Sequence, residues 1–409
     1  MGARGRLLIL SDRFPPHDRG GSERIAHLHA LGLRRRGWDV AVFTSFPPIR
    51  GAVSTIADED GLRVFRSFPL HPLSAEEEPT TSDKALELSL ELWNPWMGAP
   101  LRRAITEFRP DVIHAHYIPR ISFGAFAAAA PGVPRVLTFH GYNFECPKGG
   151  LYRKRGIICT AKPIPCRIYQ QAMTRSLERV DRMIAIARFI EHRLLESGAA
   201  RERVRWLPNP VPLDAVSAPP ASKSATVLFV GRLERLKGID VLLRAFRSLA
   251  MPDARLRIIG AGSDLERLRA LAAGDSRIDF PGWLRRDEVV EAYRGSRVVV
   301  VPSLWHEVMN TVICEAASYG RPAIATDLGG NPDLVSDGTS GFLIPAGDAD
   351  AIRDRLARLL TDDALADAMG EAARAHVASF DYDRHLDAIE DLYEEILGAS
   401  AEGSGARRA

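Results

Sequence analysis

The chain has 409 residues, more than one hydrophobic core usually supports, so two or three domains are expected. Its 46% hydrophobic and 26% charged residues are typical of a globular protein and exclude a wholly disordered chain. Lys and Arg number 54 and Asp and Glu 52, so the net charge of +2 favours neither a nucleic acid nor a strongly acidic partner.

The N-terminal residues predict a strand and no targeting segment. The apolar run at residues 7–10 is too short for a signal peptide, and no segment approaches the roughly 20 apolar residues of a membrane-spanning helix. The four cysteines are too few for a disulfide scaffold at this length. We therefore expect a cytoplasmic protein.

Short apolar runs alternate with amphipathic stretches along the first half of the chain. This alternation is typical of a parallel sheet covered by helices on both faces. The strand-like runs are residues 6–10, 40–44, 112–115, 135–139 and 183–186.

Two adjacent glycines, Gly20 and Gly21, lie between the first strand and a helix predicted over residues 22–36. Glycine lets the backbone approach a ligand, and the N–H groups at a helix N-terminus attract an anion. A tight turn capped by Ser22 explains the pattern equally well. The spacing departs from the G-x-G-x-x-G fingerprint, which argues against a redox function.

A proline-rich segment at residues 207–224 separates the two halves. Its five prolines remove backbone donors and predict an interdomain linker. Strand-like runs resume at residues 226–230, 256–260, 277–280, 298–301 and 322–326. The predicted organisation is an N-terminal domain (1–215) with a loop insertion (141–167), a C-terminal domain (216–380), a helix able to pack back on the first domain (381–398) and a disordered tail (399–409).

Two cations follow the first strand of the second half. This strand ends at Gly231, Arg232 comes next, and Lys237 opens a helix. Ligands of open parallel sheets bind beyond the carboxyl ends of the strands, where an Arg and a Lys suit a diphosphate. A solvated basic turn is the alternative.

The most informative segment begins at the apolar strand 298–301. Glu307 lies in the loop after it, and seven residues separate it from Glu315 in the next helix. The N–H groups of Met309, Asn310 and Thr311 open this helix, so a diphosphate would meet its positive end. The alternatives are a buried ion pair for Glu315 and an ordinary loop carboxylate for Glu307.

Together these motifs resemble the retaining glycosyltransferases of family 4. That resemblance implies the GT-B fold: α/β, with two Rossmann-like, doubly wound parallel-sheet domains facing a central cleft. The motifs of the second half are Gly231-Arg232, Lys237-Gly238, Glu307, Glu315-Ala316, Gly320-Arg321-Pro322 and Gly329-Gly330. Weaker matches in the first half are Gly20-Gly21, residues 111–116, Phe139-His140-Gly141 and Pro208-Asn209.

The resemblance also implies a role for each candidate residue. Arg232 and Lys237 would neutralise the donor diphosphate, Glu315 would hold the ribose hydroxyls, and Glu307 and His140 would face the transferred sugar. The other residues expected at the donor site are Gly20, Gly21, Gly231, Met309, Asn310 and Thr311. Family members need no divalent metal, so the resemblance implies no metal site and no cofactor.

The implied reaction is the transfer of a sugar, with retention, from a nucleotide diphosphate donor to a glycan, lipid-linked or small-molecule acceptor. A sugar-nucleotide epimerase or hydrolase on the same fold is one alternative, and a non-catalytic sugar-nucleotide-binding subunit is another. We prefer attack from the face of the departing phosphate, because no side chain is clearly placed as a covalent nucleophile.

The insertion at residues 141–167 departs from the family pattern. It contains Cys146, Cys159 and Cys166, which with His140 number enough for a zinc site, although their spacing matches no standard motif. A loop that faces the acceptor is the favoured interpretation. Its basic residues suit an anionic lipid headgroup, hence a peripheral contact at the inner membrane face, or a diphosphate-linked acceptor; a solvated loop explains them equally well.

Overall fold

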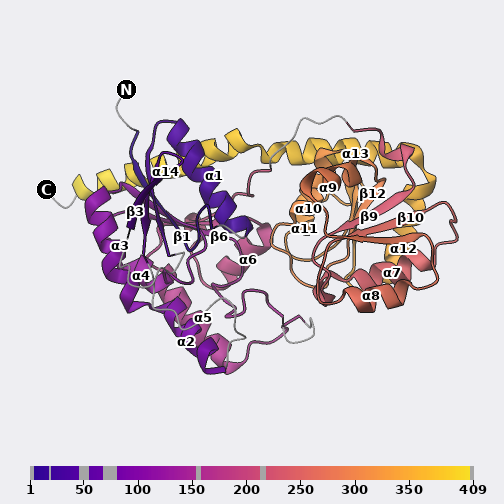
Figure 1. Ribbon diagram of the computed structural model, residues 1–409. Helices are drawn as coiled ribbons and strands as arrows, with labels where there is room; N and C mark the ends of the chain where they lie inside the picture. The colour runs from indigo at the N-terminus through magenta and orange to yellow at the C-terminus, as the bar shows by residue number, and fades with distance from the viewer. Residues whose placement is uncertain are drawn as a thin grey trace.

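The computed structural model describes residues 4–17, 20–45, 55–67, 81–152, 158–211 and 218–405. Two domains lie side by side, each a sheet covered by helices, and the C-terminal helix runs from the second domain back along the first (Figure 1). This is the two-domain α/β architecture predicted from the sequence. The predicted boundary at 215/216 lies outside the described residues.

The first domain is built on an eight-stranded sheet in the order β3-β4-β2-β1-β5-β6-β7-β8. All neighbouring strands are parallel except β3 and β4. The strands are β1 (Arg6–Ser11), β2 (Asp39–Thr44), β3 (Thr55–Glu59), β4 (Leu62–Arg66), β5 (Val112–Ala115), β6 (Arg135–Phe139), β7 (Arg182–Ala185) and β8 (Val204–Trp206). The helices are α1 (Gly21–Arg35), α2 (Thr81–Leu92), α3 (Pro95–Phe108), α4 (Phe123–Ala128), α5 (Ile164–Leu177) and α6 (Arg188–Glu196).

The second domain has a six-stranded, all-parallel sheet in the order β11-β10-β9-β12-β13-β14. The strands are β9 (Thr226–Val230), β10 (Arg255–Ile259), β11 (Ile278–Gly282), β12 (Val298–Val301), β13 (Ala323–Thr326) and β14 (Gly341–Ile344). The helices are α7 (Ile239–Arg247), α8 (Leu265–Ala272), α9 (Arg286–Arg294), α10 (Thr311–Ser318), α11 (Asn331–Leu334), α12 (Ala349–Thr361) and α13 (Asp363–Val377). Short 3-10 turns include η4 (Arg235–Lys237) and η5 (Ala378–Phe380).

Strand β12 shows why these sequences form parallel strands. Its four valines are at most 4% exposed, because helices cover both faces of the sheet. Burying a valine side chain contributes about 1.5–3 kcal/mol, so a run of four fixes this strand at the centre of the sheet. The position of β12 in turn fixes where the following loop, with Glu307, leaves the sheet.

The last helix, α14 (Tyr382–Gly405), belongs to the core of the first domain. Leu386, Ile389 and Tyr393 pack in one buried cluster with Leu7 and Ile9 of β1. The helix continues to Gly405, beyond residue 398 where the sequence predicts a disordered tail to begin. Residues 406–409 lie outside the described residues.

Glycine at position 32 allows α14 to approach α1. A Cβ atom at Gly32 would come 2.3 Å from the Tyr382 hydroxyl and 2.5 Å from Leu386 Cδ1. Arg36 at the end of α1 adds ion pairs to Asp387 at 2.5 Å and Glu390 at 2.9 Å. The close approach and these pairs dock α14 in a defined register.

Residues 349–377 form two helices, because the Asp362 side chain accepts a hydrogen bond from Leu365 N and so starts α13. Residues 81–108 form α2 and α3. Among the described residues, no helix is both long and apolar enough to span a membrane.

Candidate functional site

A cavity of about 530 Å³ lies between the two domains. Gly20, Gly21 and Arg24 line it from the first domain, and Thr311 and Glu315 line it from α10 of the second. Other lining residues are Ile25, Leu28, Asn209, Pro210, Val211, Arg286, Met309, Cys314, Ser318 and Tyr319. The structure therefore brings five of the predicted donor-site residues, from both halves of the chain, to one cavity.

The N-termini of α1 and α10 both reach this cavity. Gly20 is the N-cap of α1, and among the described residues no side chain caps this helix, so Ser22 does not serve as its cap. On α10 the Asn310 side chain accepts a hydrogen bond from Val312 N at 3.1 Å. Asn310 thus starts the helix, and the positive ends of both helix dipoles lie at the cavity, where they attract a negatively charged ligand.

Glu315 occupies one wall of the cavity and is half-buried. Its Oε2 atom accepts a hydrogen bond from the Tyr293 hydroxyl at 2.8 Å. Burial, reinforced by this carboxylate, raises the pKa of Tyr293 well above its usual value, so the phenol remains a donor. The bond holds the Glu315 carboxylate at the cavity wall, where it can accept hydrogen bonds from hydroxyl groups of a ligand.

Lys237 and Glu307 form a buried ion pair at the carboxyl edge of the second sheet. Lys237 Nζ lies 2.7 Å from Glu307 Oε1, and the two side chains are 18% and 9% exposed. The same oxygen accepts hydrogen bonds from Ser303 Oγ at 2.7 Å and Trp305 Nε1 at 2.9 Å. Three donors therefore fix one carboxylate oxygen, while none of these bonds uses Oε2.

Gly238 allows this ion pair to form. It has φ of +65°, and a Cβ atom there would lie 1.9 Å from the carbonyl oxygen of Pro302. The loop that carries Lys237 can therefore pack directly on the loop after β12 that carries Glu307. In the motif Lys237-Gly238, the lysine therefore supplies the charge and the glycine allows the two loops to pack closely.

The structure does not bring Arg232 to this pair. Its side chain is 69% exposed and forms an ion pair of 2.8 Å with Glu234. Gly231 precedes it at the carboxyl end of β9, with φ of +155°. An exposed guanidinium takes the nearest carboxylate as partner, and such surface pairs contribute little, so a phosphate can displace Glu234.

His140 follows β6 in the first domain and lines neither of the two cavities described here. Its Nε2 atom lies 3.0 Å from His116 Nδ1, and burial lowers its pKa to about 3, so the imidazole is neutral. The neighbouring Tyr142 hydroxyl donates a 3.4 Å hydrogen bond to the carbonyl oxygen of Glu307. The start of the insertion therefore contacts the loop that carries the ion pair.

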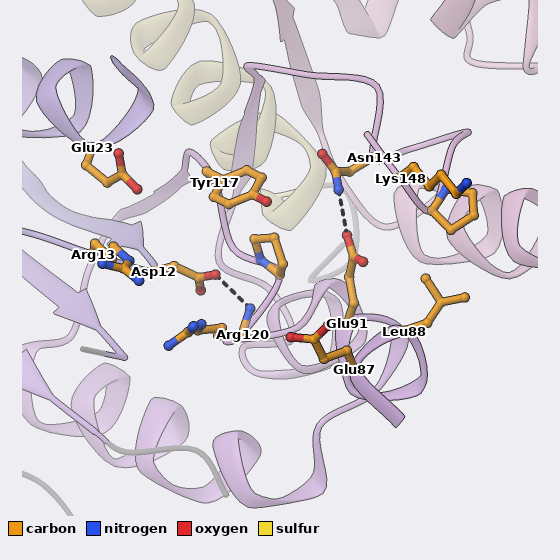
Figure 2. Close-up of a pocket in the computed structure, with 12 residues that line it drawn as sticks. Asp12, Arg13, Glu23, Glu87, Leu88, Glu91, Tyr117, Arg120, Asn143 and Lys148 are labelled. Carbon is orange, nitrogen blue, oxygen red and sulfur yellow. Dashed lines mark hydrogen bonds between the residues drawn. The ribbon is translucent and has the colours of Figure 1, made fainter. Parts of the chain in front are cut away.

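A second cavity, of about 640 Å³, lies in the first domain (Figure 2). Asp12 and Glu91 face it, and burial raises the pKa of each carboxyl to about 7. Asp12 accepts hydrogen bonds from the backbone N–H groups of Arg120 and Ile121, and Glu91 accepts one from Asn143 Nδ2 at 3.1 Å. The other lining residues are Arg13, Glu23, Glu87, Leu88, Tyr117, Pro119, Pro147 and Lys148.

The sequence analysis did not identify this second cavity. Its residues come from the loops after β1 and β5, from α1 and α2 and from the insertion, with no spacing pattern to link them. Asn143, Pro147 and Lys148 of the insertion line its wall, and the interpretation of the insertion as an acceptor-facing loop stays a prediction. Within the described residues, the only close group of three metal-ligating side chains is His29, His114 and His116, which does not include the cysteines of the insertion.

Two family models match the chain in succession. The glycosyl transferase 4-like domain matches residues 20–210, and glycosyl transferases group 1 matches residues 214–376. The D-inositol 3-phosphate glycosyltransferase of Corynebacterium aurimucosum is 36% identical over 448 residues, and the match covers 99% of both chains. The chain belongs to the glycosyltransferases of family 4. The family predicted from the sequence motifs is thereby confirmed, and the protein is an enzyme.

Other relatives of this glycosyltransferase have related names. The D-inositol 3-phosphate glycosyltransferase of Corynebacterium jeikeium is 31% identical, with 94% of each chain covered. The phosphatidyl-myo-inositol mannosyltransferase of Mycobacterium leprae is 29% identical, with 74% of this chain and 78% of the relative covered.

Solved structures of low sequence identity share the fold of this glycosyltransferase. Sucrose-phosphate synthase from Thermosynechococcus elongatus matches with a TM-score of 0.75 and 21% identity, covering 97% of this chain and all of the other. Anabaena HepE, solved with UDP, matches with a TM-score of 0.70 and 18% identity, covering 95% of this chain and all of the other. These matches confirm the predicted GT-B fold.

Proposed function

We propose that this glycosyltransferase transfers a sugar from a nucleotide diphosphate donor to an acceptor hydroxyl, with retention of the anomeric configuration and without a divalent metal. The observation that carries this proposal is the interdomain cavity lined by Glu315 and by the starts of two helices. The buried Lys237–Glu307 pair supports it, because Glu307 lies two residues before Met309, which lines the cavity. These groups suit the charged, sugar and ribose parts of such a donor.

The charged groups would act on the departing nucleoside diphosphate. Lys237, the N–H groups at the start of α10 and the guanidinium of Arg232, once it leaves Glu234, would stabilise the negative charge that develops on the phosphate. Glu315 would hold the ribose hydroxyls. Positive charge from side chains and a helix terminus would supply the stabilisation that a divalent cation supplies in other transferases.

The state of Glu307 supports attack from the face of the leaving group. Its Oε1 atom accepts three hydrogen bonds, one of them from an ammonium, which makes the carboxylate a weak nucleophile. In the proposed step the bond from the anomeric carbon to the phosphate oxygen breaks, and its electron pair stays on that oxygen. The acceptor hydroxyl forms the new bond on the same face, and its proton passes to the departing phosphate.

The second cavity is the proposed acceptor site. Protonated Asp12 and Glu91 can donate, and their ionised forms can accept, so the pair is suited to the hydroxyls of a polyol. Arg13, Arg120 and Lys148 on its wall can bind an acceptor phosphate. Because the relatives are named for inositol phosphates, D-inositol 3-phosphate is the first acceptor to test.

We also propose a cytoplasmic enzyme with a peripheral membrane contact. Trp93 and Trp96, at the junction of α2 and α3, are 55% and 50% exposed, and tryptophan is typical of membrane interfaces. When anionic vesicles are sedimented, the parent protein should be recovered in the pellet with them. The Trp93→Ala/Trp96→Ala variant should remain in the supernatant. Equal recovery of both proteins in the supernatant would reject the contact.

The function is tested by screening a panel of nucleotide sugars for thermal stabilisation and then assaying transfer in the presence of EDTA. NMR of the product gives its anomeric configuration. Lys237→Ala should lose transfer, whereas Lys223→Ala, a change of an exposed lysine in the same domain, should keep it. Donor consumption without an acceptor would indicate a hydrolase or epimerase, and donor binding without turnover would indicate a binding subunit.

A further inference from the structure

Residues 142–152, at the start of the insertion, contact two separate parts of the molecule, and we call them the bridge segment. Three of their side chains line the second cavity, which is the proposed acceptor site: Asn143, Pro147 and Lys148. Figure 2 shows Asn143 and Lys148 on one side of this cavity, beside Glu91. The bridge segment is therefore part of the wall that faces the proposed acceptor.

The two ends of the bridge segment contact the loop of the second domain that carries Glu307. At one end the Tyr142 hydroxyl donates a hydrogen bond of 3.4 Å to the Glu307 carbonyl oxygen. At the other end the Tyr152 ring stands edge-to-face with the Trp305 ring, with a centroid distance of 5.9 Å and an interplanar angle of 87°. Edge-to-face pairs of this kind are favourable. The wall of the second cavity and the loop of the ion pair thus contact the same short stretch of chain.

Trp305 in turn contacts both members of the Lys237–Glu307 ion pair. Its Nε1–H group donates to Glu307 Oε1 at 2.9 Å, and Lys237 Nζ lies 5.8 Å from the centroid of its ring. A cation within about 6 Å of a tryptophan ring is attracted to the face of that ring. The Trp305 side chain therefore helps to set the direction of the Glu307 carboxylate.

Core packing does not fix the Trp305 ring. The residue is only partly buried, and it belongs to none of the four buried apolar clusters found among the described residues. Since an indole N–H near solvent can exchange its acceptor for water, the net gain from its hydrogen bond is modest. The ring contact with Tyr152 supplies a restraint that the hydrogen bond alone does not give.

The backbone around Tyr152 is itself held in place. A Cβ atom at Gly150 would lie 2.2 Å from Tyr152 Cε1, so a glycine there leaves room for the ring to fold back over the segment. Leu151 is 8% exposed and packs in the core of the first domain. Its carbonyl oxygen accepts a hydrogen bond of 2.8 Å from Cys159 N, and Tyr152 forms an antiparallel bridge with Ile158.

A buried carboxylate anchors the rest of the bridge segment. The Glu145 side chain is fully buried and accepts hydrogen bonds from Lys162 Nζ at 2.5 Å and from Arg193 Nε at 2.8 Å. Lys162 lies near the end of the insertion and Arg193 on α6, so these charge-assisted bonds tie the segment to the first domain from two sides. The bridge segment is thus a fixed part of the first domain.

We propose that Tyr152 is a positioning residue that holds Trp305 on the ion pair and so links the wall of the acceptor cavity to the donor side of the reaction. When Trp305 is released, Glu307 keeps its bonds to Lys237 and Ser303, but its carboxylate is free to turn. The role of the ion pair in transfer rests on the proposed function, whereas the position of Trp305 does not.

Fluorine NMR of the full chain, labelled with 5-fluorotryptophan, tests the position of Trp305 directly. The chain has six tryptophans, so the signal of residue 305 is identified by its loss in Trp305→Phe. Tyr152→Leu keeps an apolar side chain but removes the ring, and it should shift this signal. Tyr152→Phe keeps the ring and should restore the parent signal.

Asn143→Ala tests the link to the acceptor cavity, because it changes the cavity wall. It should shift the Trp305 signal in the parent but not in the Tyr152→Leu background. Phe380→Leu is the matched control, since it removes an edge-to-face contact with His376 in the second domain. It should lower the melting temperature and leave the Trp305 signal as it is.

A transfer assay with the panel of nucleotide sugars and D-inositol 3-phosphate gives the functional readout. Tyr152→Leu should lower kcat roughly 3–10-fold with an unchanged donor KM, and Tyr152→Phe should keep the parent kcat. A merely structural role of Tyr152 would lower the melting temperature and leave kcat per folded molecule unchanged.

Four results would overturn the proposal. They are an unchanged Trp305 signal in Tyr152→Leu, a signal that Tyr152→Phe does not restore, an Asn143→Ala shift of equal size with and without the Tyr152 ring, and full kcat of Tyr152→Leu. A shifted Trp305 signal in a protein that transfers no sugar would reject only the proposed function.

Discussion

Replacing Lys237 by methionine removes the charge of the buried pair while keeping most of the side-chain volume. Glu307 would keep its bonds to Ser303 and Trp305 but would lose an ammonium at 2.7 Å, in a place where the carboxylate is only 9% exposed. Breaking a buried pair costs about 3–5 kcal/mol. We expect about 3 kcal/mol here, the low end, because two neutral donors remain.

The loss should appear in both stability and turnover. In a domain of this size, about 3 kcal/mol corresponds to a fall in the melting temperature of about 6–12 °C. Turnover should fall roughly 10²–10³-fold, as when one preorganised charge is removed from a transition state. Calorimetry and a radiolabelled transfer assay measure the two effects.

A double-mutant cycle separates the pair from general damage. Because Glu307→Gln removes the stranded charge, the Lys237→Met/Glu307→Gln variant should be more stable than the sum of the single changes predicts, by about 1–3 kcal/mol. Lys223→Met is the control for loss of a surface lysine. Additive stabilities, together with full turnover by Lys237→Met, would refute both the structural and the catalytic role of the pair.

Further predictions concern the docking of α14, the second cavity and the exposed arginine. Gly32→Ala should destabilise by about 1–3 kcal/mol in urea unfolding, because its Cβ atom would overlap Tyr382, whereas Gly398→Ala, with open space around it, should not. Burial raises the pKa of Glu91 to about 7, so the folded state binds a proton that the unfolded state loses above its usual value of 4.5. The free energy of unfolding should therefore fall by up to about 3 kcal/mol as the pH rises from 4.5 to 7, and Glu91→Gln should lack this part of the fall; parallel pH profiles would contradict the assignment. Arg232→Ala should reduce turnover roughly 10²-fold with little change in melting temperature, because its ion pair is exposed.

Buried regular elements could be predicted well from the sequence. The strands β5, β6, β9 and β12 have the bounds that the strand-like runs predict, because a strand buried on both faces consists mostly of apolar residues. Edge strands and surface helices have a weaker pattern of apolar residues than strands buried on both faces. The pair β3–β4 and helix α2 accordingly lie within residues 51–100, where the sequence shows little periodicity.

The site could be predicted only where its residues share one local motif. Glu307 and Glu315 belong to one segment, and the structure places Glu315 on the wall of the interdomain cavity and Glu307 in a bond with Lys237. Glu91 looks like any surface acid in the sequence, and only folding brings it to Asn143. Tyr152 and Trp305 lie in different domains, so no local spacing indicates that their rings touch.

The packing of α14 also bears on how the chain is made. A ribosome releases residues 6–206 long before Tyr382, yet the apolar face around Leu7 and Ile9 is completed by side chains of α14. The first domain to leave the tunnel is therefore the last to finish folding, and the second domain can form while that face is still uncovered. A nascent chain stalled before residue 382 would expose this apolar surface, which chaperones recognise.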